Sequence, residues 1–270
     1  MNDIERWTKH SSMSDPAGHT GLVAQLPSDI RALTSIIQGL LLHSDWLTIY
    51  GLDSAAYCTV SRNTLPVADR LDTIIANDSQ DWGIPRPPGK RAIGTCRDFA
   101  LMLCSFLRSK GVPSRVRCGF ADYFSTRWED HWICEYWEGR TRKWLLADSQ
   151  IDSLLAANCQ IEFDPVNVPR RAFMTAGEAW LACRDGKLDP NYFGHGKVTG
   201  AWFIKINVIR DHYVLNGHET SAWDNWRAES LPGRVVREDE IALLDDLAAH
   251  PEQQLVEVAP GWLQWERSSR

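Results

Sequence analysis

Residues 94–150 change from a helical to a strand-like pattern, and this change constrains the fold more than any other feature of the chain. Thr95 and Asp98 fit a T-x-x-D capping box, so a helix should begin at Cys96. Its apolar residues recur at spacings of three and four up to the Lys-Gly signal at 110–111. Three strands joined by turns should then follow, over 114–124, 131–139 and 142–150. A helix packed on an antiparallel sheet predicts an α+β fold.

The rest of the chain gives a weaker but readable pattern. Helical periodicity predicts helices over 28–43, 67–78, 175–186 and 237–250, and segment 81–94, rich in proline and glycine, should be a loop. Residues 200–215 fit a strand or a helix, and a helix is favoured in their second half. We expect a loose N-terminal arm at 1–20, a core domain at 21–160, and a C-terminal helical extension at 161–270 packed on that core.

Charge and cysteine content narrow the class of protein. The net charge of −6 argues against nucleic acid as a partner, because nucleic-acid binding normally needs a basic patch. No apolar run approaches the length of a membrane span, and no export signal is visible, so we expect a cytoplasmic protein without a membrane partner. The seven cysteines are an odd number without a C-x-x-C pair, which predicts reduced thiols and no metal site.

Cys96 has the position expected of a nucleophile. The start of a helix carries unsatisfied N–H groups and partial positive charge, and both stabilise a thiolate. His131 begins the second expected strand and Asp148 lies near the end of the third, so a short turn between antiparallel strands can make them neighbours. The pattern therefore permits a Cys96–His131–Asp148 triad of nucleophile, base and orienting acid. Taken alone, Cys96 fits a packing role as well, and Asp130 and Asp152 are the competing acids.

Four motifs within three stretches of the sequence carry a family resemblance: Gly-Thr-Cys at 94–96, Gly-Val-Pro-Ser-Arg at 111–115, His131 and Asp148. The stretches "GTCRDFALMLCSFLRSKGVPSRVRCGF", "DHWICEYW" and "WLLADSQ" resemble the transglutaminase-like superfamily over 94–150. The resemblance implies the papain-like α+β core of arylamine acetyltransferases, peptide N-glycanases and transglutaminases. It also implies Cys96 as nucleophile, His131 as general base and acid, and Asp148 as the residue that orients His131. The steps His131-Trp132-Ile133 and Asp148-Ser149-Gln150 depart from the usual His-Ala-Trp and Asp-Pro-Thr. The C-terminal part resembles an extension of uncharacterised bacterial members.

Several further residues are candidates for the same site. An acyl-transfer centre needs hydrogen-bond donors for its oxyanion, and the Cys96 backbone N–H is one natural donor. The second could be an indole N–H, and the candidates for this donor or for the pocket wall are Trp46, Trp82 and Trp132. The loop 81–94 can form one lip of a cleft, where three cations would favour a carboxylate-bearing ligand: Arg86, Lys90 and Arg91. A solvated loop and core tryptophans are the alternatives.

These features predict a cysteine-dependent acyl-transfer enzyme that acts on an amide, peptide or thioester carbonyl through a thioacyl intermediate. Hydrolysis is favoured over amide formation with an amine, because nothing in the sequence identifies an amine site. A non-catalytic scaffold of the same fold is the alternative from another class. The chemistry requires no cofactor, and its partner would be a peptide or small-molecule substrate; the oligomeric state stays open.

Overall fold

A computed structural model describes residues 4–57, 66–221, 224, 226, 235–254 and 260–265. Cys58 lies outside these residues. Contacts divide the chain into two compact units. Unit 1 comprises Met1–Val116 and Ile133–Val168, and unit 2 comprises Arg117–Trp132 and Pro169–Arg270. Each unit is assembled from two separate stretches of sequence.

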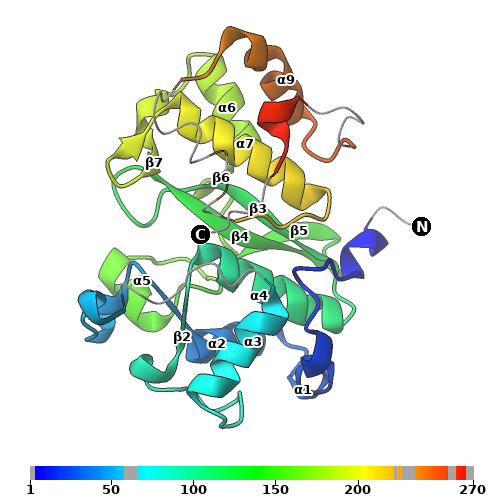
Figure 1. The fold of residues 1–270 in the computed structure, drawn as a ribbon, viewed down its shortest axis with the longest axis vertical. Coiled ribbons are helices and arrows are strands. Elements are labelled where there is room, and N and C mark those ends of the chain that lie inside the picture. Colours follow the sequence, from blue (N-terminus) through cyan, green and yellow to red (C-terminus); the bar gives the residue numbers. More distant parts are fainter. Residues whose placement is uncertain are drawn as a thin grey trace. The chain divides into compact units, whose positions relative to one another are not determined.

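Helix α4, Cys96–Ser109, is the central element of unit 1. Helices α1 (Thr20–Gln25), α2 (Ile30–Leu40) and α3 (Val67–Asn77) all contact it (Figure 1). Twelve residues of α4, from Arg97 to Arg108, are buried, so the helix is covered along almost its whole length. The helices expected over 28–43, 67–78 and from Cys96 are confirmed, although α2 ends at Leu40.

A strand that could not be predicted from the sequence directly follows α2. Strand β1, Leu41–His43, pairs in parallel with β2, Ala92–Gly94. The expected loop over 81–94 therefore ends in a strand, and this strand leads straight into α4. Two three-residue strands give no readable alternation, because a period of two needs a longer run to be visible.

The start of α4 is fixed by the predicted capping box. The Asp98 carboxylate accepts a hydrogen bond from the Thr95 backbone N–H at 2.7 Å. Arg70 of α3 holds the same carboxylate at 3.2 Å and also donates to the Ile93 carbonyl at 2.6 Å. A Cβ added at Gly94 would lie 2.9 Å from an Asp98 carboxylate oxygen, closer than such atoms normally approach. Glycine, cap and buried arginine thus define where the helix begins.

The three strands expected after α4 are present as β3 (Ser114–Ala121), β4 (Trp128–Glu138) and β5 (Lys143–Ala147). Strands β4 and β5 form an antiparallel hairpin in which Cys134 pairs with Ala147. The remaining strands are β6 (Phe173–Thr175), β7 (Phe193–His195) and β8 (Val198–Thr199). In the described part of the chain the order is β6-β3-β4-β7-β8, with β5 on β4. The fold is α+β, as predicted.

Helix α4 packs on this sheet within unit 1. The sulfur of Cys104 on α4 lies 3.3 Å from that of Cys134 on β4. The Ser114 hydroxyl at the start of β3 donates to the Cys104 carbonyl at 3.2 Å. Arg115 on β3 binds Glu135 on β4 at 2.7 Å, and its guanidinium lies 4.3 Å from the ring centroid of Trp144 on β5. The arginine of the Gly-Val-Pro-Ser-Arg turn therefore joins all three strands.

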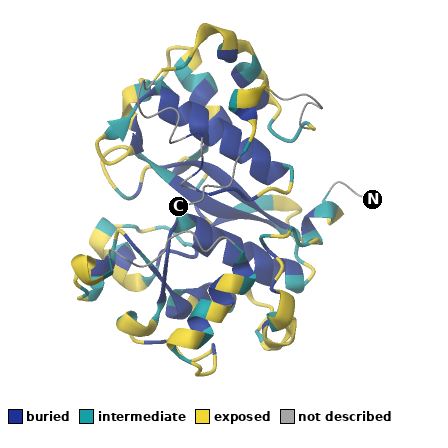
Figure 2. Ribbon diagram, in the orientation of Figure 1, coloured by how far each residue is buried: buried dark blue, intermediate teal, exposed yellow. Residues whose placement is uncertain are grey.

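Unit 2 is built around helix α7, Ala201–Leu215. It contacts α6 (Ala176–Arg184) and α9 (Glu238–Ala249), and Figure 2 shows α7 buried along its length while both partners keep exposed faces. The helices expected over 175–186 and 237–250 are confirmed, including the cap at Thr175. Residues 201–215 are helical throughout. Their pattern was ambiguous because a helix that is buried on all sides lacks a polar stripe.

Two expectations about chain organisation need correction. The described part of 1–20 is not a loose arm: Trp7 is 6% exposed, and the hydroxyl of buried Ser14 accepts a hydrogen bond from Arg108 of α4 at 2.8 Å. Polar composition concealed this packing. The boundaries of the units also fall away from residue 160, because residues 117–132 make their contacts with the C-terminal part of the chain.

Two adjacent charges on α7 bind strands β3 and β4 inside unit 2. Asp211 accepts two hydrogen bonds from Arg117 on β3, at 3.0 and 2.8 Å, and a third from the Cys118 backbone N–H at 2.9 Å. Arg210 is fully buried; it donates to Asp224 at 2.7 Å and lies 3.6 Å from Asp130 on β4. Burial disfavours the charge on Arg210, but Asp224 and Asp130 together raise its pKa above the ordinary value.

Arg210→Met should lower the free energy of unfolding by about 3–5 kcal/mol, because it leaves two buried carboxylates without their cation. Urea unfolding followed by tryptophan fluorescence measures the loss. Arg140→Met is the matched control, since this side chain is 94% exposed and its removal should change stability by less than about 0.5 kcal/mol. Equal stability of the two variants would contradict the role assigned to Arg210.

Candidate active site

Cys96 is the first residue of α4 and differs from the packing cysteines in its exposure. It is partly exposed, whereas Cys104, Cys118 and Cys134 are buried. Burial raises the pKa of the Cys118 and Cys134 thiols well above the ordinary value. Cys96 lies instead at a helix N-terminus, where backbone N–H groups and the helix dipole favour a thiolate.

Strands β1 and β2 bring a second segment beside the start of α4. His43 is the register partner of Gly94, and the Ser44 backbone N–H donates to the Gly94 carbonyl at 3.0 Å. Because the strands are parallel, the residues that follow each strand leave from the same edge. Residues 43–46 therefore lie next to the Gly94-Thr95-Cys96 turn. Of this segment, only Trp46 could be named as a candidate from the sequence, since so short a strand cannot be recognised there.

Asp148 directly follows β5 and is 2% exposed. Its backbone N–H donates to the Pro165 carbonyl at 2.7 Å, and its carboxylate accepts from the Gln150 backbone N–H at 3.0 Å. The hydroxyl of neighbouring Ser149 donates to the Phe99 carbonyl at 2.9 Å. Since Phe99 lies one helical turn after Cys96, this hydrogen bond fixes the Asp148 segment against the first turn of α4.

His131 lies on β4 in unit 2 and is 2% exposed. Two rings from the segment after β3 meet it edge-on: Tyr123 at 5.9 Å and Phe124 at 4.9 Å between ring centroids. The rings restrict how the imidazole can rotate. This role could not be predicted from the sequence, because aromatic residues after a strand are common and their contacts depend on the loop conformation.

The structure gives both competing acids other partners. Asp130 lies 3.6 Å from Arg210 in the buried network of unit 2. Asp152 is the N-cap of α5, Ser153–Cys159, where its carboxylate accepts from the Leu155 backbone N–H at 2.9 Å. Its second oxygen lies 3.9 Å from Arg91. These roles account for both carboxylates without catalysis.

The three tryptophan candidates differ in their positions and in their suitability as oxyanion donors. Trp82 stacks on Phe106 at a centroid distance of 6.3 Å, and Phe106 lies ten residues, or about 15 Å, along α4 from Cys96. The expectation of an oxyanion donor at Trp82 is therefore wrong. Trp132 follows His131 on β4, so its side chain points to the opposite face of the strand. Trp46 is partly exposed and follows β1, and it is the indole that stays a candidate.

The three cations expected on a cleft lip differ in their burial and in their hydrogen-bond partners. Arg86 is only 1% exposed and donates to the carbonyls of Asp78 and Gln80 at 3.0 and 2.7 Å. These hydrogen bonds hold its own loop together, so the prediction that Arg86 is a lip residue is wrong. The prolines around it indicate a loop but do not reveal that this side chain is buried. Arg91 donates to the Arg86 carbonyl at 2.9 Å and lies over Tyr50. Lys90 is exposed, and its role on a lip stays a prediction.

The described residues contain neither a candidate metal cluster nor a candidate membrane-spanning helix. No group of three or more His, Cys, Asp or Glu side chains in these residues could hold a metal ion. None of the helices in the described ranges has the length and apolar character needed to cross a membrane.

Comparison with known proteins supports the family resemblance. Residues 76–149 match the Transglutaminase-like superfamily, which confirms the resemblance to it for this segment. The segment contains Cys96, His131 and Asp148, and the match supports a cysteine-dependent enzyme. No curated protein matches the chain.

One solved structure is similar in part. It is a "Putative Cysteine Protease" from Cytophaga hutchinsonii, 17% identical, with a TM-score of 0.39. The match covers 66% of this chain and 50% of that protein, so this chain spans about half the length of the structure that it resembles.

Alkylation by iodoacetamide at neutral pH should modify Cys96 faster than any other described cysteine. Cys159 and Cys183 are the matched controls, because both are partly exposed. Burial raises the pKa of each, that of Cys183 to about 11, so both stay protonated at neutral pH. Peptide mapping by mass spectrometry, in a Cys58→Ser background, gives the rate at each site. Labelling of Cys96 no faster than that of Cys159 would contradict an activated thiol.

Proposed function

We propose that this protein is a cysteine hydrolase that cleaves an amide or thioester bond with a Cys96–His131–Asp148 triad. The observation that supports it most is the placement of Cys96. A partly exposed cysteine opens a helix whose start is fixed by Gly94, the Thr95–Asp98 cap and buried Arg70. A packing cysteine needs none of these features, whereas a thiolate nucleophile needs a rigid, electropositive and accessible position.

The strand register supports His131 and Asp148 as the partners of Cys96. Cys134, three residues after His131 on β4, pairs with Ala147, which directly precedes Asp148. Both candidates therefore lie beyond the same end of the β4–β5 ladder, His131 three residues and Asp148 one residue past the Cys134–Ala147 pair. Each is buried and held by its own neighbours, His131 by Tyr123 and Phe124, Asp148 by backbone groups. Rigid support of this kind is what a general base and its orienting acid require.

The reaction follows from these three groups. The Cys96 thiol gives its proton to His131, and the thiolate sulfur adds to the substrate carbonyl carbon. Collapse of the tetrahedral intermediate breaks the bond to the leaving amine or thiol, which takes the proton from His131. Water, deprotonated by the same imidazole, then attacks the thioacyl carbonyl, and the sulfur leaves as thiolate with the acid as product. Asp148 holds the imidazole orientation and stabilises its protonated form.

The oxyanion of each intermediate needs two donors. The backbone N–H of Cys96 lies in the first turn of α4, where N–H groups have no partner within the helix. We propose the Trp46 indole N–H as the second donor, because β1 delivers residues 43–46 beside Gly94. The substrate class is a peptide or small molecule that carries an amide or thioester.

Cys96→Ala should reduce hydrolysis of the substrate by at least 1000-fold, since no other group can form the thioacyl bond. The unfolding transition should change little, because the side chain is partly exposed. Cys159→Ser is the matched control and should keep full activity. Mass spectrometry of a slow ester or thioester substrate should show an acyl adduct on the wild-type protein that is absent from the variant. Full activity of Cys96→Ala would refute the proposal.

Asp148→Asn tests the orienting acid and should lower kcat by more than about 100-fold, with a smaller change in KM. Asp152→Asn is its matched control: this residue caps α5, and asparagine is an equally good cap, so activity should be unchanged. Loss of activity in Asp152→Asn but not in Asp148→Asn would contradict this assignment and identify Asp152 as the orienting acid. Adding hydroxylamine as acceptor then shows whether an amine can replace water.

A further inference from the structure

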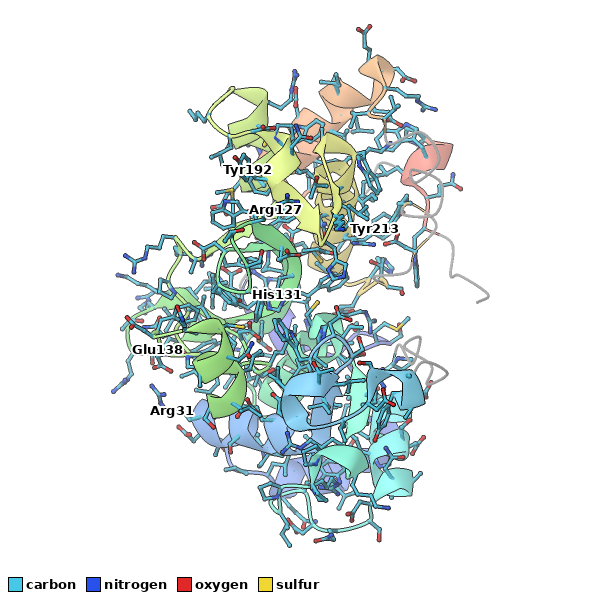
Figure 3. All side chains as sticks on the ribbon, turned by 90° about the vertical axis from the view of Figure 1, so that its left-hand side faces the viewer. Arg31, Arg127, His131, Glu138, Tyr192 and Tyr213 are labelled. Carbon is cyan, nitrogen blue, oxygen red and sulfur yellow. The ribbon has the colours of Figure 1, made fainter. Side chains whose placement is uncertain are left out.

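Two buried thiols in unit 1 take no part in the proposed reaction. The Cys104 thiol on α4 donates to the Cys134 sulfur on β4 across 3.3 Å, and both side chains are fully buried. Cys134 lies on β4 between His131 and Glu138, which are labelled in Figure 3. Cys104 follows Cys96 by eight residues, or about 12 Å along α4. The pair is therefore a second thiol site, separate from the nucleophile.

The contact between these two sulfurs has the geometry from which a disulfide can form. A disulfide needs two cysteine side chains that point toward each other and a sulfur–sulfur bond of about 2.05 Å. Closing the 3.3 Å contact therefore needs only a small displacement shared by two side chains. The Ser114 hydroxyl holds the Cys104 carbonyl at 3.2 Å, and Cys134 is paired with Ala147 in the sheet. The folded backbone thus keeps both thiols in place.

The two cysteines lie on the two separate stretches of sequence that make up unit 1. Cys104 belongs to the first stretch, Met1–Val116, and Cys134 is the second residue of the other stretch, Ile133–Val168. The chain between these stretches, residues 117–132, belongs to unit 2. A bond between the two sulfurs would join both stretches of unit 1 covalently, where the chain returns from unit 2.

We propose that Cys104 and Cys134 form a disulfide, with a low-molecular-weight disulfide such as glutathione disulfide as the oxidant. The thiolate of one cysteine attacks a sulfur of the oxidant, which gives a mixed disulfide and releases one glutathione as thiolate. The thiolate of the other cysteine then attacks the protein sulfur of the mixed disulfide and releases the second glutathione. The two cysteines lose two electrons and two protons, and one glutathione disulfide becomes two glutathione thiols.

Burial determines when this exchange occurs. Burial and the hydrogen bond from Cys104 raise the pKa of the Cys134 thiol, so this thiol stays protonated in the folded protein, where glutathione cannot reach it. The first step therefore takes place while α4 is transiently separated from β4, or during folding. The second step is completed as the contact re-forms, because the native separation gives the second thiol a high effective concentration.

Peptide mapping after incubation with glutathione disulfide tests the crosslink. The protein carries Cys58→Ser and Cys96→Ala, so that these two thiols do not compete. Urea is raised, below the unfolding transition, until a maleimide labels both Cys104 and Cys134 in a parallel sample without glutathione. The peptides that contain Cys104 and Cys134 should then be found linked to each other at least about tenfold more often than any other pair, because of their proximity.

Two variants are the controls for this map. Cys118 is also fully buried, so Cys118→Ser is the matched control and should leave the yield of the crosslink unchanged. Cys104→Ser should abolish the crosslink without joining Cys134 to another cysteine. Thermal unfolding of each variant shows that it is folded. The proposal is overturned if both cysteines react with the maleimide but give only mixed disulfides, or link no more often to each other than to the remaining cysteines.

The stability of the crosslinked protein is a second test and needs no further variant. A disulfide that closes the loop 104–134 restricts the unfolded chain, so the crosslinked protein should unfold at a temperature at least about 5 °C higher than the untreated reduced protein. An unchanged or lower midpoint would mean that the native contact does not accommodate the bond, and the proposal would fail. Neither readout depends on activity, so the disulfide and the proposed function are tested separately.

Discussion

The hydrogen bond between Asp98 and the backbone of Thr95 is the interaction on which the described site depends. It determines that α4 begins at Cys96 and not a residue earlier or later, and a shift of one residue would turn the thiol by about 100° around the helix axis. Arg70 makes the interaction rigid because it binds both the carboxylate and the strand that leads into the helix. Other parts of unit 1 stabilise the same helix. Three helices pack on α4, and Ser149, just after the β4–β5 hairpin, donates a hydrogen bond to the first turn of α4.

Helix α7, in the C-terminal part of the chain, binds strands β3 and β4, and this role could not be predicted from its sequence. Arg210 and Asp211 on α7 bind β4 and β3 through buried ion pairs, and Asp130, the partner of Arg210, is the neighbour of His131. Buried ion pairs add little net stability, because removing both charges from water is expensive. They do impose one geometry, since any other register of α7 would leave the charges unpaired. We infer that α7 holds the strand that carries His131 in a single position.

Local chemistry explains why some features could be predicted and others could not. The cap at Thr95, the helix that follows it and the three strands depend on residues close in sequence, so their pattern is visible. Strands β1 and β2 pair residues about fifty positions apart, as His43 with Gly94, and each is too short to show alternation. The positions of Arg86 and Trp82 could not be predicted, because burial of a side chain inside a loop depends on the path of the whole segment. The Tyr123 and Phe124 contacts with His131 arise from the same kind of long-range geometry.

The segment between β3 and β4 places two aromatic rings against the imidazole of His131 and also forms part of a cavity wall in unit 2. Tyr123 and Phe124 meet the His131 ring, while Asp122 and Arg127 at the two ends of the same segment line the adjoining cavity. A change in the backbone path of this segment would therefore move the cavity wall and the two rings together.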